Sequence, residues 1–141
     1  MMRWLPYALV CSAFLACADY FVKLASSRIS PSVGMFVYGA TTFTVGLIWV
    51  GSLKLRQQPL LITPQGLLYS LAVGVAFSIV TLLLYLTFAH VEVSIGSPTI
   101  RLTGILIASL LGILLLHEPF TWRYLAGLIL TVAGVALIVF R

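Results

Sequence analysis

The sequence predicts an all-α, polytopic membrane protein that crosses the bilayer five times. Apolar residues make up 62% and charged residues 8% of the 141 residues, and the mean hydropathy is +1.17. Soluble domains are far less apolar than this. The apolar residues form five runs, each close to the roughly 20 residues that a helix needs to cross about 30 Å of hydrocarbon. The short connections between the runs leave almost nothing outside the bilayer.

The first two predicted spans are residues 4–24 and 33–53. The first begins at Trp4, whose amphipathic ring favours the membrane interface. A small, hydroxylic connection follows it, and Pro31 in this connection suits a turn and the entry into the second helix. The second span ends before Lys54, where the longest connection starts.

The last three predicted spans are residues 67–89, 95–116 and 122–140. Pro64 precedes the third span, a tight reversal separates it from the fourth, and Pro119 lies in the turn before the fifth. Turns this short predict that the three spans form a compact antiparallel group.

The net charge of +5 indicates contacts with lipid headgroups rather than a nucleic-acid partner. The basic residues are sparse, and most of them fall at span borders or in loops, where anionic headgroups attract them. These residues are Arg3, Arg28, Lys54, Arg56 and Arg141.

An odd number of spans places the two termini on opposite sides of the membrane. Four basic residues then lie on the side of the N-terminus and three on the other side, which is almost no bias. The first group is Arg3, Lys54, Arg56 and Arg123, and the second is Lys23, Arg28 and Arg141. A chain with so little orientation preference could insert in both directions.

Small and polar residues follow one face of four spans at helical spacing. In the fourth span they are Ser97, Arg101, Gly104, Ala108 and Gly112, and in the third Ser70, Gly74, Ser78, Thr81 and Tyr85. In the first span they are Ser12, Ala16, Asp19 and Lys23, and in the fifth Gly127, Thr131 and Gly134. Small residues allow helices to pack closely in lipid, which is the interpretation for Gly104, Gly112, Gly127 and Gly134. The stripes of the first, third and fourth spans could also line a polar cavity.

Three ionisable residues lie clearly within the spans: Asp19, Lys23 and Arg101. A charge within hydrocarbon usually faces protein or water, so each is a candidate functional residue. Arg101 could snorkel to the nearer interface, bind a carboxylate or phosphate, or neutralise Asp19. Asp19 could form an i,i+4 pair with Lys23 that is only structural, or it could exchange a proton.

The two remaining acidic residues, Glu92 and Glu118, belong to loops and are weaker candidates for proton exchange. Glu118 and His117 are expected to cap the fifth span and to complement its dipole. The sequence contains no nucleophile elbow, phosphate loop, metalloprotease helix or clustered metal ligands. We therefore expect neither an enzyme nor a bound metal or cofactor.

The C-terminal half resembles a known family in the order of several short motifs. These are Leu84-Tyr85-Leu86-Thr87-Phe88-Ala89-His90, then Ser97-Pro98, then His117-Glu118-Pro119-Phe120-Thr121, then Leu125-Ala126-Gly127 and Ala133-Gly134-Val135. They resemble the EamA-like branch of the drug/metabolite transporter superfamily. Phe21-Val22-Lys23-Leu24-Ala25 is similar to the end of that family's first span.

The resemblance implies a carrier of small molecules built from five-helix domains, which usually occur twice in one chain. This chain looks like a single-domain member, with residues 1–141 forming one half-transporter domain. Some relatives carry a basic residue shortly after the proline of the fourth span, and Arg101 after Pro98 fits that position. Ile100 stands where the family often has an acidic residue.

The leading hypothesis is therefore a transporter that works by alternating access as an antiparallel homodimer in the inner or plasma membrane. Two inverted halves would enclose a polar cavity near the midplane. The candidate cavity residues are Arg101, Tyr85, Asp19, Ser78, Thr81, Ser97 and Tyr38. Arg101 favours an anionic or zwitterionic small molecule as substrate.

Two alternatives remain open from the sequence. The chain could be a non-transporting membrane subunit that uses its small-residue faces to assemble with a larger partner. It could also be a lipid-linked sugar flippase or an exporter like the small multidrug resistance proteins. Those exporters have four spans and a central carboxylate in the first span, whereas Asp19 is off-centre here.

Overall fold

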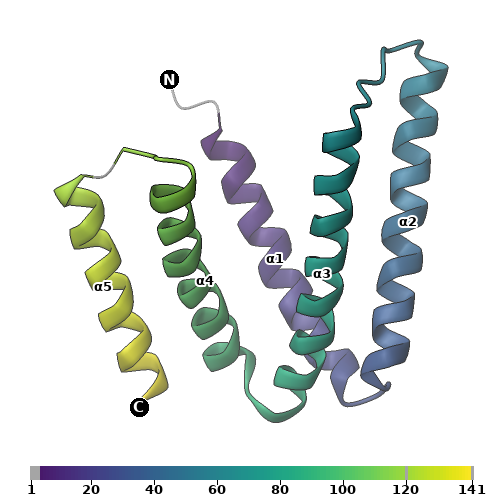
Figure 1. Cartoon of the computed structure of the whole chain (residues 1–141). Helices are drawn as coiled ribbons and strands as arrows, with labels where there is room; N and C mark the ends of the chain where they lie inside the picture. Colours follow the sequence, from purple (N-terminus) through teal and green to yellow (C-terminus); the bar gives the residue numbers. More distant parts are fainter. Residues whose placement is uncertain (1–3, 120, 141) are drawn as a thin grey trace. The chain divides into compact units, whose positions relative to one another are not determined.

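A computed structural model describes residues 4–119 and 121–140 of the chain. This part contains five α-helices and no strand: α1 (Leu5–Ser26), α2 (Pro31–Leu55), α3 (Pro64–His90), α4 (Val93–Leu115) and α5 (Trp122–Val139) (Figure 1). Each helix is long and apolar enough to cross a membrane. The prediction of an all-α, polytopic protein with five membrane helices is confirmed. Arg3 and Arg141, two of the predicted headgroup contacts, lie outside the described residues.

Both ends of α2 follow from local backbone chemistry. Pro31 occupies the first turn, where its fixed φ suits the helix and its missing N–H leaves no intrahelical bond unmade. At the other end Gln57 adopts a left-handed conformation with φ of 53°. Its N–H donates to the Lys54 carbonyl at 3.1 Å, and the Gln58 N–H donates to the Leu53 carbonyl at 3.1 Å. This is a Schellman ending with glutamine in the position that usually holds glycine.

The turn between α4 and α5 has a different cap from the one expected. Thr121 is the N-cap of α5, and its hydroxyl accepts a hydrogen bond from the Tyr124 N–H at 3.3 Å. The prediction that Glu118 and His117 cap α5 is wrong. His117 instead takes a left-handed conformation with φ of 53° and ends α4. The Glu118 N–H then donates a hydrogen bond to the Gly112 carbonyl at 3.2 Å.

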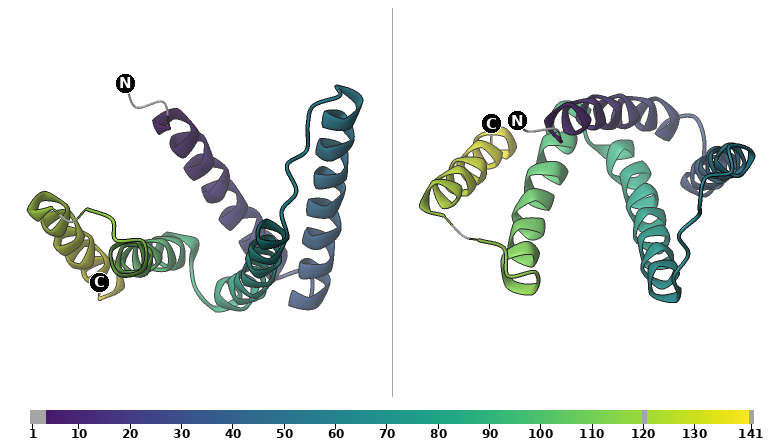
Figure 2. Two further views of the ribbon diagram at one scale, coloured as in Figure 1. Left: turned by 45° about the horizontal axis from the view of Figure 1, so that its top comes forward. Right: turned by 90° about the horizontal axis from the view of Figure 1, so that it is seen from above.

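The chain divides into two compact units, and the dividing points lie within α1 and after α3. The first unit contains α1 up to Asp19 together with α4 and α5. The helices α4 and α5 are neighbours whose backbones approach each other (Figure 1, Figure 2). The Tyr124 hydroxyl of α5 hydrogen-bonds to the Ser109 hydroxyl of α4. Each hydroxyl thereby gains a hydrogen-bond partner, which lipid hydrocarbon could not provide.

The second unit contains α1 from Tyr20 onward together with α2 and α3. The backbones of α2 and α3 approach closely, because Gly34 lets the Tyr85 ring lie directly against α2. A Cβ at Gly34 would stand 2.6 Å from Cε1 of Tyr85 and 2.8 Å from its hydroxyl. The Lys23 ammonium donates to the Phe88 carbonyl at 2.6 Å. That bond places a cation at the C-terminal, electronegative end of α3.

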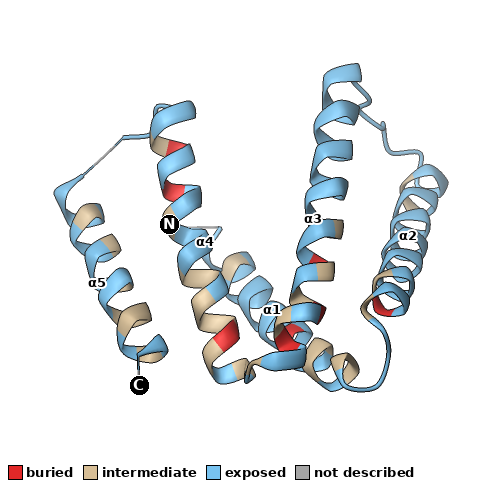
Figure 3. Cartoon of the chain, turned by 60° about the horizontal axis from the view of Figure 1, so that its bottom comes forward, coloured by how far each residue is buried: buried red, intermediate tan, exposed pale blue. Residues whose placement is uncertain are grey.

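Burial in this protein is the reverse of burial in a soluble domain. Large apolar side chains lie mostly on the outside, including Leu61 at 93% and Leu130 at 73% exposed (Figure 3). The buried residues are mainly small or polar: Asp19, Gly34, Thr81, Tyr85, Phe88, Gly96, Ser109 and Gly112. In a bilayer the apolar exterior contacts lipid, and polar groups gain by facing other protein.

Candidate functional site

The candidate site is a paired aspartate and arginine that join α1 to α4. Nη2 of Arg101 lies 2.8 Å from both Oδ1 and Oδ2 of Asp19, and Nε lies 3.1 Å from Oδ2. Asp19 is only 2% exposed, whereas Arg101 is 35% exposed. The carboxylate is therefore buried in the pair, while about a third of the Arg101 side chain remains accessible.

Two further groups hold this pair in place, one from each helix. Ser97 precedes Arg101 by one turn of α4, and its hydroxyl donates to Oδ2 of Asp19 at 2.5 Å. Leu15 precedes Asp19 by one turn of α1, and its carbonyl accepts from Nη2 of Arg101 at 3.2 Å. The i,i+4 spacing on both helices explains why these four residues meet.

The pairing shows which of the expected contacts Arg101 makes within the described residues. Its side chain reaches Asp19 instead of snorkelling free of it, so neutralisation of Asp19 is the arrangement observed. A carboxylate buried in hydrocarbon without a partner would be very costly, and an ion pair with good geometry offsets most of that cost. Asp19, Arg101 and Ser97 are thus the sequence-predicted site residues that the structure brings together.

One end of the Arg101 guanidinium keeps unused donors. Nε and Nη2 make all of its hydrogen bonds within residues 4–119 and 121–140, and Nη1 makes none there. Nη1 carries two N–H groups. A polar group of a ligand could bind to them while Asp19 stays in place.

Ser78 and Thr81 on α3 satisfy their hydroxyls within their own helix. Ser78 donates to the Gly74 carbonyl at 2.9 Å, and Thr81 donates to the Phe77 carbonyl at 2.8 Å. Thr81 is buried and Ser78 is half-buried. Both hydroxyl oxygens can still accept a hydrogen bond, but both hydroxyl protons are already donated to backbone carbonyls of α3.

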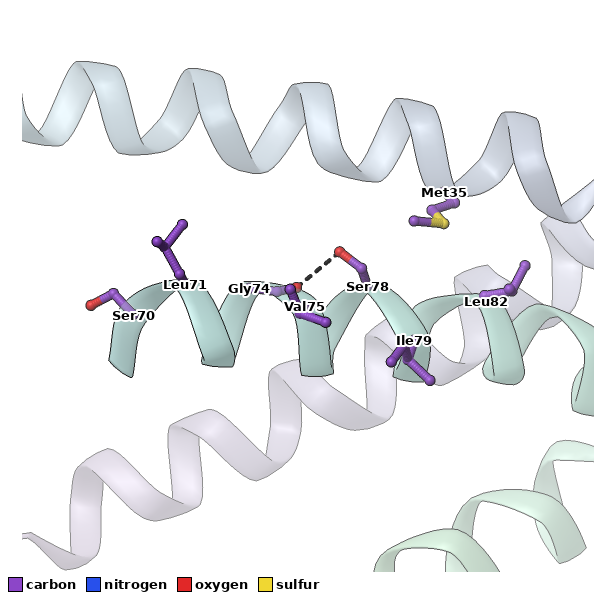
Figure 4. Close-up of a pocket in the computed structure, with 8 residues that line it drawn as sticks. All are labelled: Met35, Ser70, Leu71, Gly74, Val75, Ser78, Ile79 and Leu82. Atoms are coloured by element: carbon purple, nitrogen blue, oxygen red, sulfur yellow. Dashed lines mark hydrogen bonds between the residues drawn. The ribbon is translucent and has the colours of Figure 1, made fainter. Parts of the chain in front are cut away.

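The two candidate tyrosines differ in exposure. Tyr85 is 8% exposed and lies against Gly34, whereas Tyr38 is 40% exposed. Tyr38 and Ser78 line one hollow of about 270 Å³ between α2 and α3. A neighbouring shallow groove of about 420 Å³ has Ser70, Gly74 and Ser78 as its small residues, set among apolar side chains (Figure 4). These positions belong to the second unit, and Asp19, Ser97 and Arg101 belong to the first.

The glycines predicted to serve helix packing fall into two groups. An added Cβ at Gly104, Gly127 or Gly134 would meet nothing within 4 Å, so none of these three glycines makes a close helix contact within the described residues. Gly112 is buried, and a Cβ there would stand 2.7 Å from Oε2 of Glu118. Gly112 thus accommodates the returning Glu118 side chain.

Sequence reasoning missed Leu15 and Gly34. Leu15 contributes only its backbone carbonyl, which every residue possesses, so no sequence signal marks it. Gly34 lay within the predicted second span, and a lone glycine in a helical pattern can indicate a close packing contact.

Comparison with known proteins supplies one match. The model of the EamA-like transporter family matches residues 2–140. No significant match was found among curated proteins or among solved structures. The family match extends over nearly the whole chain, and it agrees with the five apolar helices and with the resemblance noted in the C-terminal half. The chain belongs to the EamA-like transporter family.

Proposed function

We propose that this membrane transporter carries a small molecule by alternating access, as an antiparallel homodimer in the inner or plasma membrane. Family membership supports transport rather than enzymatic activity. Many carriers bind substrate between inverted repeats near the bilayer midplane. With five helices, a single chain is one half of that arrangement, and a second copy in the opposite orientation supplies the other half.

The near balance of basic residues supports insertion in both orientations. Lys54 in the last turn of α2 and Arg123 in the first turn of α5 lie at helix ends on one side. Lys23 in the last turn of α1 and Arg28 in the following turn oppose them. The positive-inside rule therefore gives little preference for either orientation. On this proposal residues 1–141 act as one half-transporter domain.

The Asp19–Arg101 pair is the single observation that carries the site assignment. Intramembrane charges are costly to bury and mark substrate or ion pathways in membrane proteins. Nη1 of Arg101, which makes no hydrogen bond among the described residues, offers two donors to an oxygen of a bound solute. We assign Arg101, Asp19 and Ser97 to substrate binding, with an anionic or zwitterionic small molecule as the ligand. Tyr85, Ser78, Thr81 and Tyr38 are assigned to the lining of the transport pathway.

Efflux from proteoliposomes tests this function even before the substrate has been identified. Vesicles containing the purified protein are loaded with a cytoplasmic metabolite extract, and the solutes that leave are identified by mass spectrometry. The wild-type protein is expected to release a defined subset of solutes that protein-free vesicles retain. Arg101→Gln is expected to abolish this release, whereas Arg56→Gln, which removes a basic residue outside the helices, is expected to preserve it. An Arg101→Gln profile identical to wild type would refute the site assignment.

A further inference from the structure

We propose that Asp19 sets the charge selectivity of the Arg101 site, so that the site admits net-neutral solutes and excludes net anions. The inference rests on the proposed function and revises its substrate class: zwitterions remain, neutral solutes are added, and net anions are excluded. Neutral solutes here include zwitterions whose own cation accompanies the carboxylate. Charge, geometry and the placement of the other ionisable groups support this selectivity.

The first step concerns charge. The carboxylate of Asp19 lies within 3.1 Å of Arg101 at Nε and within 2.8 Å at Nη2. The pair is therefore neutral as a whole, and the negative charge of Asp19 offsets a large part of the attraction that Arg101 alone would exert on an anion. A net anion bound at Nη1 would therefore introduce an uncompensated negative charge into a low-dielectric region.

The second step concerns why Asp19 stays in place. Its carboxylate accepts hydrogen bonds from Nε, Nη2 and the Ser97 hydroxyl, and it is 2% exposed. A solute carboxylate that displaced it would leave a buried, unpaired charge behind, which costs more than the new pair returns. Binding at the free Nη1 end avoids that cost.

The third step concerns hydrogen bonding at Nη1. Its two N–H groups can donate to a carbonyl, amide or hydroxyl oxygen as well as to one oxygen of a carboxylate. A neutral acceptor adds no net charge, and a zwitterion brings its own compensating cation. Both classes satisfy the donors without charging the site.

The fourth step concerns other charged groups near Asp19. Lys23 lies one turn further along α1 and directs its ammonium to the Phe88 carbonyl at 2.6 Å. Glu92 and Glu118 lie at the ends of α4, outside its helical residues. Among the described residues, Asp19 forms its ion pair with Arg101. Asp19 is thus the acidic side chain that balances Arg101.

A gain of anion binding on removal of the Asp19 charge tests the inference. The purified protein is heated in detergent with sodium acetate or with sodium chloride at equal ionic strength, and the unfolding midpoint is followed by tryptophan fluorescence. Wild type is expected to give equal midpoints in both salts. Asp19→Asn leaves Arg101 uncompensated, so its acetate dissociation constant should be at least about tenfold lower than that of wild type.

Three controls make the result specific. Asp19→Asn/Arg101→Gln should lose the acetate effect, and Asp19→Glu, which retains the charge, should behave as wild type. Glu118→Gln removes an acidic group outside the site and should also behave as wild type. If the Asp19→Asn protein does not fold, the Asp19→Ser protein is measured in its place.

Two results would overturn the inference. One is specific stabilisation of wild type by acetate that Arg101→Gln abolishes, because the native site would then accept an anion. The other is a folded Asp19→Asn or Asp19→Ser protein with no gain in acetate affinity. Either result leaves the efflux assay intact. Conversely, a gain of acetate binding without wild-type solute release would sustain the charge selectivity and refute the transport function.

Discussion

Oδ1 of Asp19 and Nη2 of Arg101 lie 2.8 Å apart, although 82 residues separate them in the sequence. The pair joins α1 to α4 through side-chain contacts, whereas α4–α5 and α2–α3 join through close backbone approach. The charged contact therefore links two helices at a point where their backbones do not approach closely, and breaking it would leave a buried charge without its partner.

Coupling between Asp19 and Arg101 is measurable as a double-mutant cycle. Asp19→Asn and Arg101→Gln should each destabilise the protein, because each leaves a partner's charge or hydrogen bonds uncompensated. The double variant should recover part of the loss, with a coupling free energy of about 1–3 kcal/mol. Unfolding in detergent with increasing denaturant measures all four proteins. Strictly additive losses would mean that the contact contributes nothing.

Close packing of α2 on α3 depends on the absence of a side chain at residue 34. Gly34→Ala would place a Cβ 2.6 Å from Cε1 of Tyr85, and overpacking of this kind typically costs about 1–3 kcal/mol. Gly39→Ala on the same helix is the matched control, because a Cβ there meets nothing within 4 Å. Thermal unfolding of the two variants should differ. Equal midpoints would contradict the proposed contact.

A rescue variant separates ring contact from helix propensity at the same position. Replacing the ring with a smaller side chain in Gly34→Ala/Tyr85→Leu should recover part of the stability lost in Gly34→Ala. Failure of the double variant to recover any stability would indicate that Gly34 acts through its backbone and not through Tyr85.

Lys23 is expected to stabilise the end of α3. Lys23→Met removes the donor to the Phe88 carbonyl, together with a cation at a helix C-terminus, and should cost about 1 kcal/mol or somewhat more. Lys54→Met in the last turn of α2 is the comparison. Detergent unfolding of the two proteins measures the difference, and a smaller loss for Lys23→Met would contradict this role.

Dual insertion predicts that the orientation responds to single charges. A compartment-sensitive reporter fused after the last residue should give signal from both sides of the membrane in living cells. Gln58→Arg and Ser27→Arg add a charge to connections on opposite sides, and they should tip the signal in opposite directions. A reporter found on one side only, unaffected by either change, would exclude the antiparallel homodimer.

The five helices could be predicted because hydrocarbon thickness fixes both the length and the composition of a span. Hydropathy predicts the ends of these helices less well than their positions. Both α2 and α3 continue past the ends of the predicted apolar spans, since a helix can extend through the interface with polar residues. Thr121 directly precedes an apolar helix, which is a signal for an N-cap. The prediction instead assigned the cap to His117 and Glu118 because of their charges.

The Asp19–Arg101 pair could be anticipated as one of several options because intramembrane charges are few and must find partners. Ser97 was placed on the same face as Arg101 by helical spacing alone. The contacts of the Leu15 and Phe88 carbonyls could not be predicted. A backbone acceptor has no sequence signature, and which carbonyl a long basic side chain reaches depends on how two helices cross.

Water access to the Asp19–Arg101 pair tests the central claim most directly. In a protein with Cys11→Ser and Cys17→Ser, the variants Ser97→Cys and Leu130→Cys are treated in intact membranes with a charged, membrane-impermeant thiol reagent. Ser97 touches the pair, and Leu130 is an exposed apolar position of α5. We predict that Ser97→Cys reacts and that Leu130→Cys reacts only after unfolding. If Ser97→Cys is equally protected until unfolding, the pair is a dry structural contact and not part of a transport pathway.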